Sequence, residues 1–124
     1  MTDLPNTRQA VVIKAWHVHY PDPLVLQRGE QVTTHQRDDE FLGWIFCEKT
    51  GGKQGWVPES WLTLLDGGLA VVKQDYNAVE LELHPGEKCT LHQLESGWYW
   101  ATHQNGQTGW APADCLELFK EKDN

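Results

Sequence analysis

Residues 43–58 read GWIFCEKTGGKQGWVP and residues 97–112 read GWYWATHQNGQTGWAP, so each stretch begins and nearly ends with a Gly-Trp pair. Each pair of the second stretch lies 54 positions after its counterpart in the first, and the two pairs of a stretch are 12 positions apart in both. Matching intervals of this kind indicate an internal duplication. The Gly-Gly and Asn-Gly dipeptides near the middle are typical of β-hairpin turns. The sequence therefore predicts two copies of a small β unit.

The residues that precede each stretch continue the duplication. Segments 10–16 and 69–73 are rich in β-branched side chains, which favour strands. Segments 24–30 and 81–87 read LVLQRGE and LELHPGE, so each places two leucines on one face of a strand before a Gly-Glu turn. No segment has the apolar spacing of a long helix, although a single 3₁₀ turn is predicted after the last proline of each copy. We predict an all-β chain with two small units in tandem.

Composition narrows the range of partners and the cellular location. The 124 residues carry a formal net charge of −8, which disfavours binding to nucleic-acid phosphates. The three cysteines form no Cys-x-x-Cys pair, and an odd number fits a reducing compartment. The polar N-terminus lacks the pattern of a signal peptide, and no apolar run reaches the ~20 residues that span a bilayer. We therefore expect a cytoplasmic protein with no nucleic-acid and no membrane partner.

No group of residues has the spacing of a catalytic or cofactor site. A nucleophile with its base, or a glycine loop for phosphate, does not stand out, so we expect no enzyme activity, no cofactor and no small-molecule substrate. His17 and His19 lie two positions apart and could bind a metal together with Cys47, but one spaced pair is a weak signal and we predict no metal site. These histidines, with His35, could instead make ligand binding sensitive to pH.

The order Leu-x-Leu-x-x-Gly-Glu, then Gly-Trp, then Gly-Trp-x-Pro resembles the Src-homology-3 domain. Residues 10–118 resemble a tandem pair of such domains in a variant, bacterial form. The resemblance implies two five-stranded barrels, residues 10–65 and 66–119, flanked by an N-terminal segment (residues 1–9) and a tail (residues 120–124). It also implies recognition of extended, proline-rich peptides in a shallow aromatic groove beside an acidic loop.

The resemblance places a peptide-binding groove in the first copy. Its aromatic and proline positions correspond to the first tryptophan of the repeated stretch, the proline after the second, an aromatic residue three positions further, and aromatic residues of the first loop. The acidic positions lie in the first loop and in a longer polar loop that follows. The predicted groove residues are Trp16, Tyr20, Asp22, Asp38, Asp39, Glu40, Trp44, Pro58 and Trp61.

The second copy is equipped less completely. Its secondary groove is predicted to contain Tyr76, Glu80, Trp98, Tyr99 and Pro112. Cys115 stands where the third aromatic residue is expected. It is either a small buried apolar group, like Cys47 and Cys89, or an exposed thiol open to a redox or interchain role. We therefore assign ligand binding to the first copy and a supporting role to the second.

These observations predict a non-enzymatic protein-interaction module. Its expected ligand is an extended, proline-rich or basic peptide, or a loop of a partner protein, bound in the groove of the first copy. Three alternatives remain open: a pair of cell-wall domains that bind peptidoglycan peptides, a nucleic-acid-binding protein, which the net charge opposes, and an accessory subunit of an enzyme complex.

Overall fold

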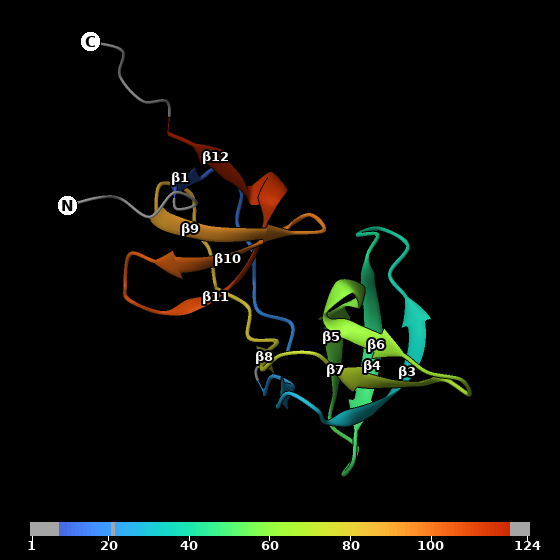
Figure 1. The fold of residues 1–124 in the computed structure, drawn as a ribbon. Coiled ribbons are helices and arrows are strands. Elements are labelled where there is room, and N and C mark those ends of the chain that lie inside the picture. Colours follow the sequence, from blue (N-terminus) through green and yellow to red (C-terminus); the bar gives the residue numbers. More distant parts are fainter. Residues whose placement is uncertain (1–7, 21, 120–124) are drawn as a thin grey trace, which may run out of the picture. The chain divides into compact units, whose positions relative to one another are not determined.

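The structure is a computed structural model that describes residues 8–20 and 22–119. In these residues all regular structure is β-strand or short 3₁₀ helix, so the all-β prediction is confirmed. No helix in the described part of the chain is long and apolar enough to cross a bilayer. The strands form two five-stranded sheets and one two-stranded sheet (Figure 1). Closure of either five-stranded sheet into a barrel stays a prediction.

The chain divides into two compact units. The first, which we call the terminal unit, joins the N-terminal strand to the C-terminal part of the chain; its described residues are 8–19 and 80–119. Its sheet has the strand order β11-β10-β9-β1-β12, with all neighbours antiparallel. Its elements are β1 (Arg8–Val12), β9 (Lys88–Glu95), β10 (Trp98–His103), β11 (Thr108–Pro112), the 3₁₀ helix η2 (Ala113–Cys115) and β12 (Leu116–Leu118).

The second compact unit, the central unit, contains Tyr20 and residues 22–79 of the described chain. Its sheet has the order β5-β4-β3-β7-β6, and β2 and β8 form the separate two-stranded pair. Its elements are β2 (Val25–Leu26), β3 (Gln31–Arg37), β4 (Trp44–Lys49), β5 (Gln54–Pro58), the 3₁₀ helix η1 (Glu59–Trp61), β6 (Leu62–Leu64), β7 (Leu69–Val72) and β8 (Tyr76–Asn77).

The two copies of the repeat exchange their first strands. The compact units therefore differ from the predicted division at residues 65 and 66. β1 comes from the first copy but lies between β9 and β12, and β7 comes from the second copy but lies between β3 and β6. The two strands carry the same pattern, so each fits the same place. Ala10 and Ala70 are completely buried, and Val12 and Val72 are each 1% exposed. Sequence similarity between the copies therefore permits the exchange.

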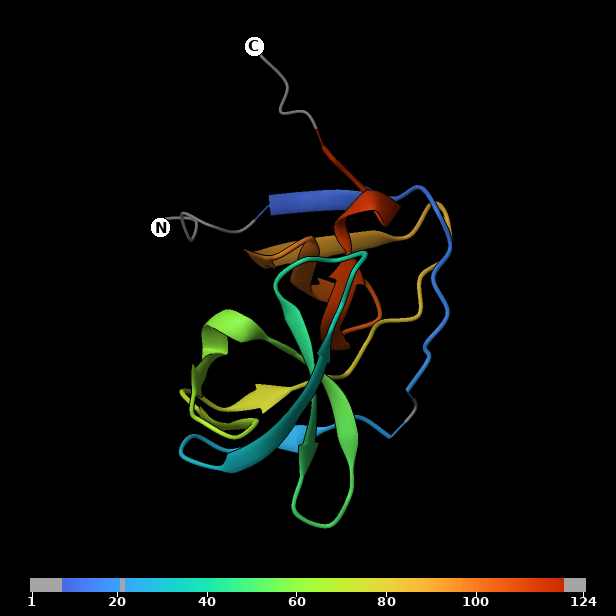
Figure 2. The ribbon, with the colours of Figure 1, turned by 90° about the vertical axis from the view of Figure 1, so that its right-hand side faces the viewer.

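The predicted hairpins and 3₁₀ turns are confirmed. β4 pairs with β5 and β10 with β11, each around the turn that the Gly-Gly or Asn-Gly dipeptide indicates. Figure 2 shows the first of these hairpins in green. Gly51 and Gly52 have φ values of 103° and 97°, which side chains rarely tolerate. The hairpins place the first tryptophan of each repeat opposite its proline, because Trp44 faces Pro58 and Trp98 faces Pro112.

The close approach of β5 to Leu24, the residue before β2, gives a testable packing prediction. A Cβ atom added to Gly55 would lie 2.8 Å from the Cβ of Leu24, which is fully buried. A leucine Cβ is fixed to the backbone and cannot rotate away. We expect Gly55→Ala to lower the free energy of unfolding by ~1–3 kcal/mol, measured by urea denaturation. Gln31→Ala, at an exposed position of the same sheet, is the control; equal midpoints for the two variants would contradict the packing.

Candidate functional site

The exchange of strands distributes the predicted groove residues over both units. Trp16 follows β1 into the terminal unit, whereas the other first-copy groove residues belong to the central unit. In the opposite direction, Tyr76 of the predicted secondary groove lies in the central unit, and Glu80, Trp98, Tyr99 and Pro112 lie in the terminal unit. Each aromatic cluster is therefore assembled from both copies of the repeat.

The central unit contains one cluster of the predicted aromatic residues. The rings of Trp61 and Tyr76 meet edge to face, with centroids 5.3 Å apart and an interplanar angle of 88°. The Tyr76 hydroxyl donates a 2.6 Å hydrogen bond to the backbone oxygen of Trp56. We call Trp44, Pro58, Trp61 and Tyr76 the Trp61 cluster. Trp44 and Tyr76 are 4% exposed and Pro58 is fully buried, so Trp61 offers most of the accessible ring surface.

The acidic loop 38–40 is fixed to the short helix that carries Trp61. Arg37, at the end of β3, donates from Nε and Nη2 to the two carboxylate oxygens of Glu59, at 2.9 and 3.0 Å. The amide of Glu59 also donates to the backbone oxygen of Gly43, at 2.7 Å. Both ends of the loop are thus tied to Glu59, the first residue of η1. Neither Arg37 nor Glu59 was among the residues predicted from the sequence.

The predicted carboxylates have different environments. Asp38 shapes its own loop, because its Oδ1 accepts hydrogen bonds from the amides of Glu40 and Phe41 at 2.8 and 3.2 Å. Asp22 forms an ion pair with Lys53 at 2.9 Å. Asp39 and Glu40 are exposed, and Tyr20 is 39% exposed. Asp39 and Glu40 are therefore the members of the predicted acidic set whose side chains remain most available to a ligand.

The terminal unit contains a second aromatic cluster, formed by Trp16 and Trp98, with Glu80 bound to Trp16. The two indole rings meet edge to face, with centroids 5.2 Å apart. Trp16 Nε1 donates to Glu80 Oε1 at 3.2 Å, and the ring of His19 packs against Trp16 at 4.8 Å. Tyr99 is half-buried, Pro112 is fully buried, and Cys115 occupies the third aromatic position with 1% exposure. Among these predicted aromatic residues, Trp16 and Tyr99 stay partly exposed.

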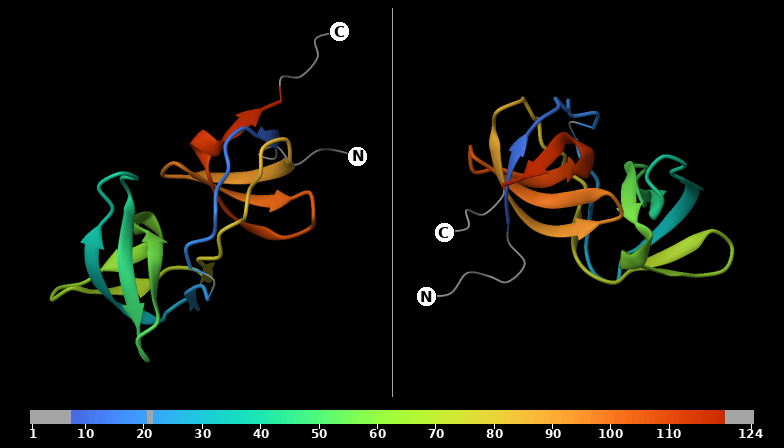
Figure 3. Two further views of the ribbon diagram at one scale, coloured as in Figure 1. Left: turned by 180° about the vertical axis from the view of Figure 1, so that it is seen from behind. Right: turned by 90° about the horizontal axis from the view of Figure 1, so that it is seen from above.

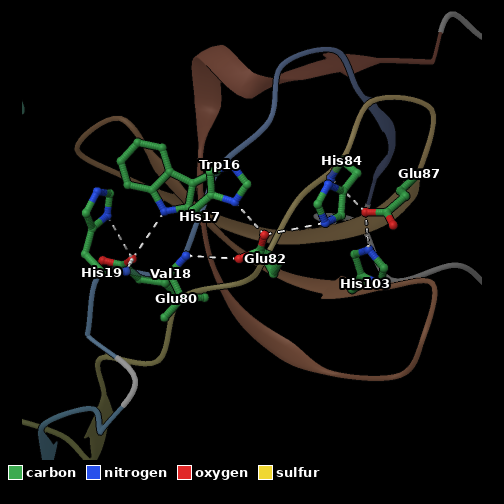
Figure 4. A network of polar contacts seen from close by, with 9 residues as sticks. All are labelled: Trp16, His17, Val18, His19, Glu80, Glu82, His84, Glu87 and His103. Atoms are coloured by element: carbon green, nitrogen blue, oxygen red, sulfur yellow. Dashed lines mark hydrogen bonds and ion pairs between the residues drawn. The ribbon is translucent and has the colours of Figure 1, made fainter.

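Glutamates from one segment bind the residues that follow β1 (Figure 4). Glu80 Oε1 also accepts a hydrogen bond from the amide of His19, at 3.2 Å. Glu82 accepts from the amide of Val18 at 3.1 Å and pairs with His17 Nδ1 at 2.6 Å. His84 Nε2 lies 3.4 Å from the same Glu82 carboxylate. The glutamates of this segment therefore hold Trp16 and the three residues that follow it.

Several carboxylates that pair with histidines have a lowered pKa. The hydrogen bond from His17 is the main cause for Glu82, and the hydrogen bond from His103 is the main cause for Glu87. His103 is itself buried and lies 2.8 Å from Glu87. In the same way, His35 lowers the pKa of Glu48. These pairs favour the ionised carboxylate in the folded state.

The lowered pKa values predict loss of stability in acid. A carboxylate whose folded pKa is below its unfolded value stabilises the fold above the unfolded pKa, and this contribution is lost as pH falls through the folded pKa. We expect the urea midpoint to decrease as the pH falls below about 5, where carboxylates of the unfolded chain begin to bind protons. Glu82→Gln should show a shallower decrease, because one of the shifted groups is absent. Parallel pH profiles for the variant and the wild type would contradict this assignment.

Glu82 was not predicted from the sequence as a contact of the first loop. The available signal was the period-two spacing of Glu80 and Glu82, which matches that of His17 and His19. It could not be used without knowing that the two segments pair. Among the described residues, no group of three or more His, Cys, Asp or Glu side chains is arranged to hold a metal. Cys47 belongs to the central unit and the two histidines to the terminal unit.

The three cysteines are buried, which decides between the two readings of Cys115. Cys47, Cys89 and Cys115 are at most 2% exposed and form no disulfide. Burial raises the pKa of Cys47 to about 12 and is also the main cause of the raised pKa of Cys89 and Cys115. The reading of Cys115 as an exposed thiol was wrong, because this smaller side chain packs into the core with Ala10 and Leu83.

Comparison with known families matches residues 10–65 to the variant SH3 domain. No solved structure matches the chain significantly. The matched segment coincides with the first copy in sequence, although the structure pairs its first strand with strands of the second copy. Domains of the SH3 type are generally non-catalytic and mediate protein interactions. The match therefore suggests that this chain is a protein-interaction module.

Proposed function

We propose that the central unit binds an extended peptide that carries basic residues, presented by a partner protein. The observation that carries the proposal is the Trp61 cluster beside the acidic loop. Trp61 and Tyr76 pack edge to face, and the Arg37–Glu59 pair ties the loop of Asp39 and Glu40 to the helix of Trp61. An aromatic surface next to exposed carboxylates suits a chain with both flat apolar and cationic groups.

The chemistry of such a ligand follows from the exposed groups. A proline-rich segment is already extended, so it loses little conformational entropy when it binds. Its rings can pack on the exposed part of Trp61, and an Arg or Lys side chain can pair with Asp39 or Glu40. The −8 net charge of the chain also attracts a basic partner over a neutral one.

The aromatic contribution can be tested with a defined set of peptides. Synthetic proline-rich 12-residue peptides that contain Arg would be titrated into the full chain, and binding followed by tryptophan fluorescence and calorimetry. We expect Trp61→Ala to weaken the best peptide at least about tenfold, as for an interface anchor. Trp100→Ala, a half-buried tryptophan of β10, is the matched control and should bind as the wild type does. Equal affinities for both variants would refute the proposed site.

The acidic contribution has a separate readout. Asp39→Asn with Glu40→Gln should lower the affinity for an Arg-containing peptide about two- to fivefold and flatten its salt dependence. The same double variant should bind the matching peptide with Gln in place of Arg unchanged. Asp38 is left intact because its carboxylate holds the loop. A loss of equal size for both peptides would show that these carboxylates do not select a basic ligand.

A further inference from the structure

Each unit contains an arm that runs along a receiving segment. In the terminal unit the first arm, residues 13–19, follows β1 and lies beside residues 80–84, with Trp16 bridged to Leu83 (Figure 3). In the central unit the second arm, residues 73–79, follows β7 and lies beside residues 23–27. The arms are equivalent by register, because Tyr76 faces Leu26 as Trp16 faces Leu83.

Backbone pairing by itself does not select which arm enters which unit. Ala10 of β1 faces Cys89, and Ala70 of β7 faces Val32, and all four side chains are buried. A sequential arrangement, in which β1 lies between β3 and β6, would offer the same kinds of backbone partners. The selection must therefore come from side chains that differ between the copies.

The receiving segment of the terminal unit matches the first arm in polarity and charge. Glu80 accepts hydrogen bonds from the Trp16 indole and the His19 amide, and Glu82 binds the His17 imidazole and the Val18 amide. The first arm contains Lys14 and two histidines and no carboxylate. The receiving segment thus supplies the acceptors that this arm requires.

The equivalent positions of the central unit cannot supply these acceptors. By register, Pro23 corresponds to Glu80 and Val25 to Glu82, so a sequential arrangement would place His17 opposite a valine. The second arm also makes a contact that the terminal unit could not offer it. Asp75 Oδ1 accepts a 2.8 Å hydrogen bond from the amide of Arg28, and the position equivalent to Arg28 is Pro85, which has no amide hydrogen.

We infer that Glu80 and Glu82 direct the first arm into the terminal unit and so select the exchanged arrangement of strands over the sequential one. The two glutamates act as positioning residues. They determine that Trp16 joins Trp98, which leaves the place beside Trp61 to Tyr76. The inference rests on the arm contacts and does not depend on peptide binding by the central unit.

A pair of introduced cysteines reports the arrangement directly. In the full-length Ala10→Cys, Val32→Cys variant, the cysteine at position 10 faces native Cys89 in the exchanged arrangement and the cysteine at position 32 in the sequential one. The reduced, unfolded variant is refolded and then oxidised with diamide, and the two disulfides are quantified by peptide mass mapping. We expect the link from position 10 to Cys89 to predominate. Adding Glu80→Ala and Glu82→Ala should lower the ratio of the two links at least about fivefold.

Two further variants make the result decisive. Glu48→Ala also removes a histidine–glutamate contact, that of His35, but outside the arms, and should leave the ratio unchanged. Pro23→Glu with Val25→Glu introduces the two carboxylates at the equivalent positions of the central unit. This variant should raise the fraction of the disulfide between positions 10 and 32. Circular dichroism checks that each variant is folded. A ratio unaffected by both the glutamate removals and the glutamate additions would overturn the inference.

Discussion

The Val12→Asp variant is expected to unfold the terminal unit while the central unit stays folded. Val12 lies on β1 and is 1% exposed in a core with Leu81, Leu83 and Cys115. An unpaired carboxylate at this position costs ~3–5 kcal/mol, a large part of the stability of a small domain. Thiol labelling measures the effect, since Cys89 and Cys115 belong to the terminal unit and Cys47 to the central unit. Cys89 and Cys115 should react quickly and Cys47 slowly.

Val72→Asp is the matched control for this prediction. Val72 holds the equivalent place on β7, also 1% exposed, so the same substitution should unfold the central unit and expose Cys47. Without strand exchange, the labels would be reversed, because β1 would then belong with Cys47. Rapid labelling of Cys47 in Val12→Asp, with Cys89 and Cys115 protected, would contradict the strand pairing.

Tyr76→Ala is expected to cause the second-largest loss of stability. Tyr76 is 4% exposed, packs against Trp61 and donates to the backbone oxygen of Trp56. Removing a buried aromatic side chain costs ~3–5 kcal/mol, measured as the free energy of unfolding in urea. Tyr76→Phe should cost about 1 kcal/mol, since only the hydrogen bond is lost. Trp16→Ala removes the equivalent residue of the terminal unit, which is only half-buried. It should therefore cost less than Tyr76→Ala.

A loss in Trp16→Ala as large as in Tyr76→Ala would mean that the two arms bury their aromatic residues equally. A loss in Tyr76→Ala confined to the terminal unit would contradict the assignment of Tyr76 to the central unit. Near-ultraviolet circular dichroism adds a local readout, because the Trp61 ring loses its edge-to-face partner in this variant.

The elements of the fold could be predicted from the sequence, but the exchange could not. The repeated Gly-Trp stretches specify hairpins through local turn chemistry, and β4–β5 and β10–β11 form as predicted. β1 and β7, in contrast, share the same buried alanine and valine pattern, so hydrophobic periodicity does not distinguish their two possible places. That choice depends on polar contacts of the arms between residues more than 60 positions apart in sequence.

The exposure of the candidate groove residues could not be predicted from the sequence. Trp44, Pro58 and Trp61 were predicted for the first groove and Tyr76 for the secondary one, and of these four only Trp61 is not buried. A small sheet has few side chains with which to fill its core, and large aromatic residues are used for that purpose. Sequence spacing identifies such residues but does not tell which ring face is covered.

The pairing of β1 with β12 also sets an order of events during synthesis. Val12 leaves the ribosome 104 residues before its partner Leu116. In the meantime β3 and β6 are already available, and β1 matches the place between them that β7 later takes. Domains generally fold as they emerge, so β1 and β7 can compete for this place before β12 exists. Any β1 that pairs there first has to be released before the exchanged fold is complete, which would add a late step to folding.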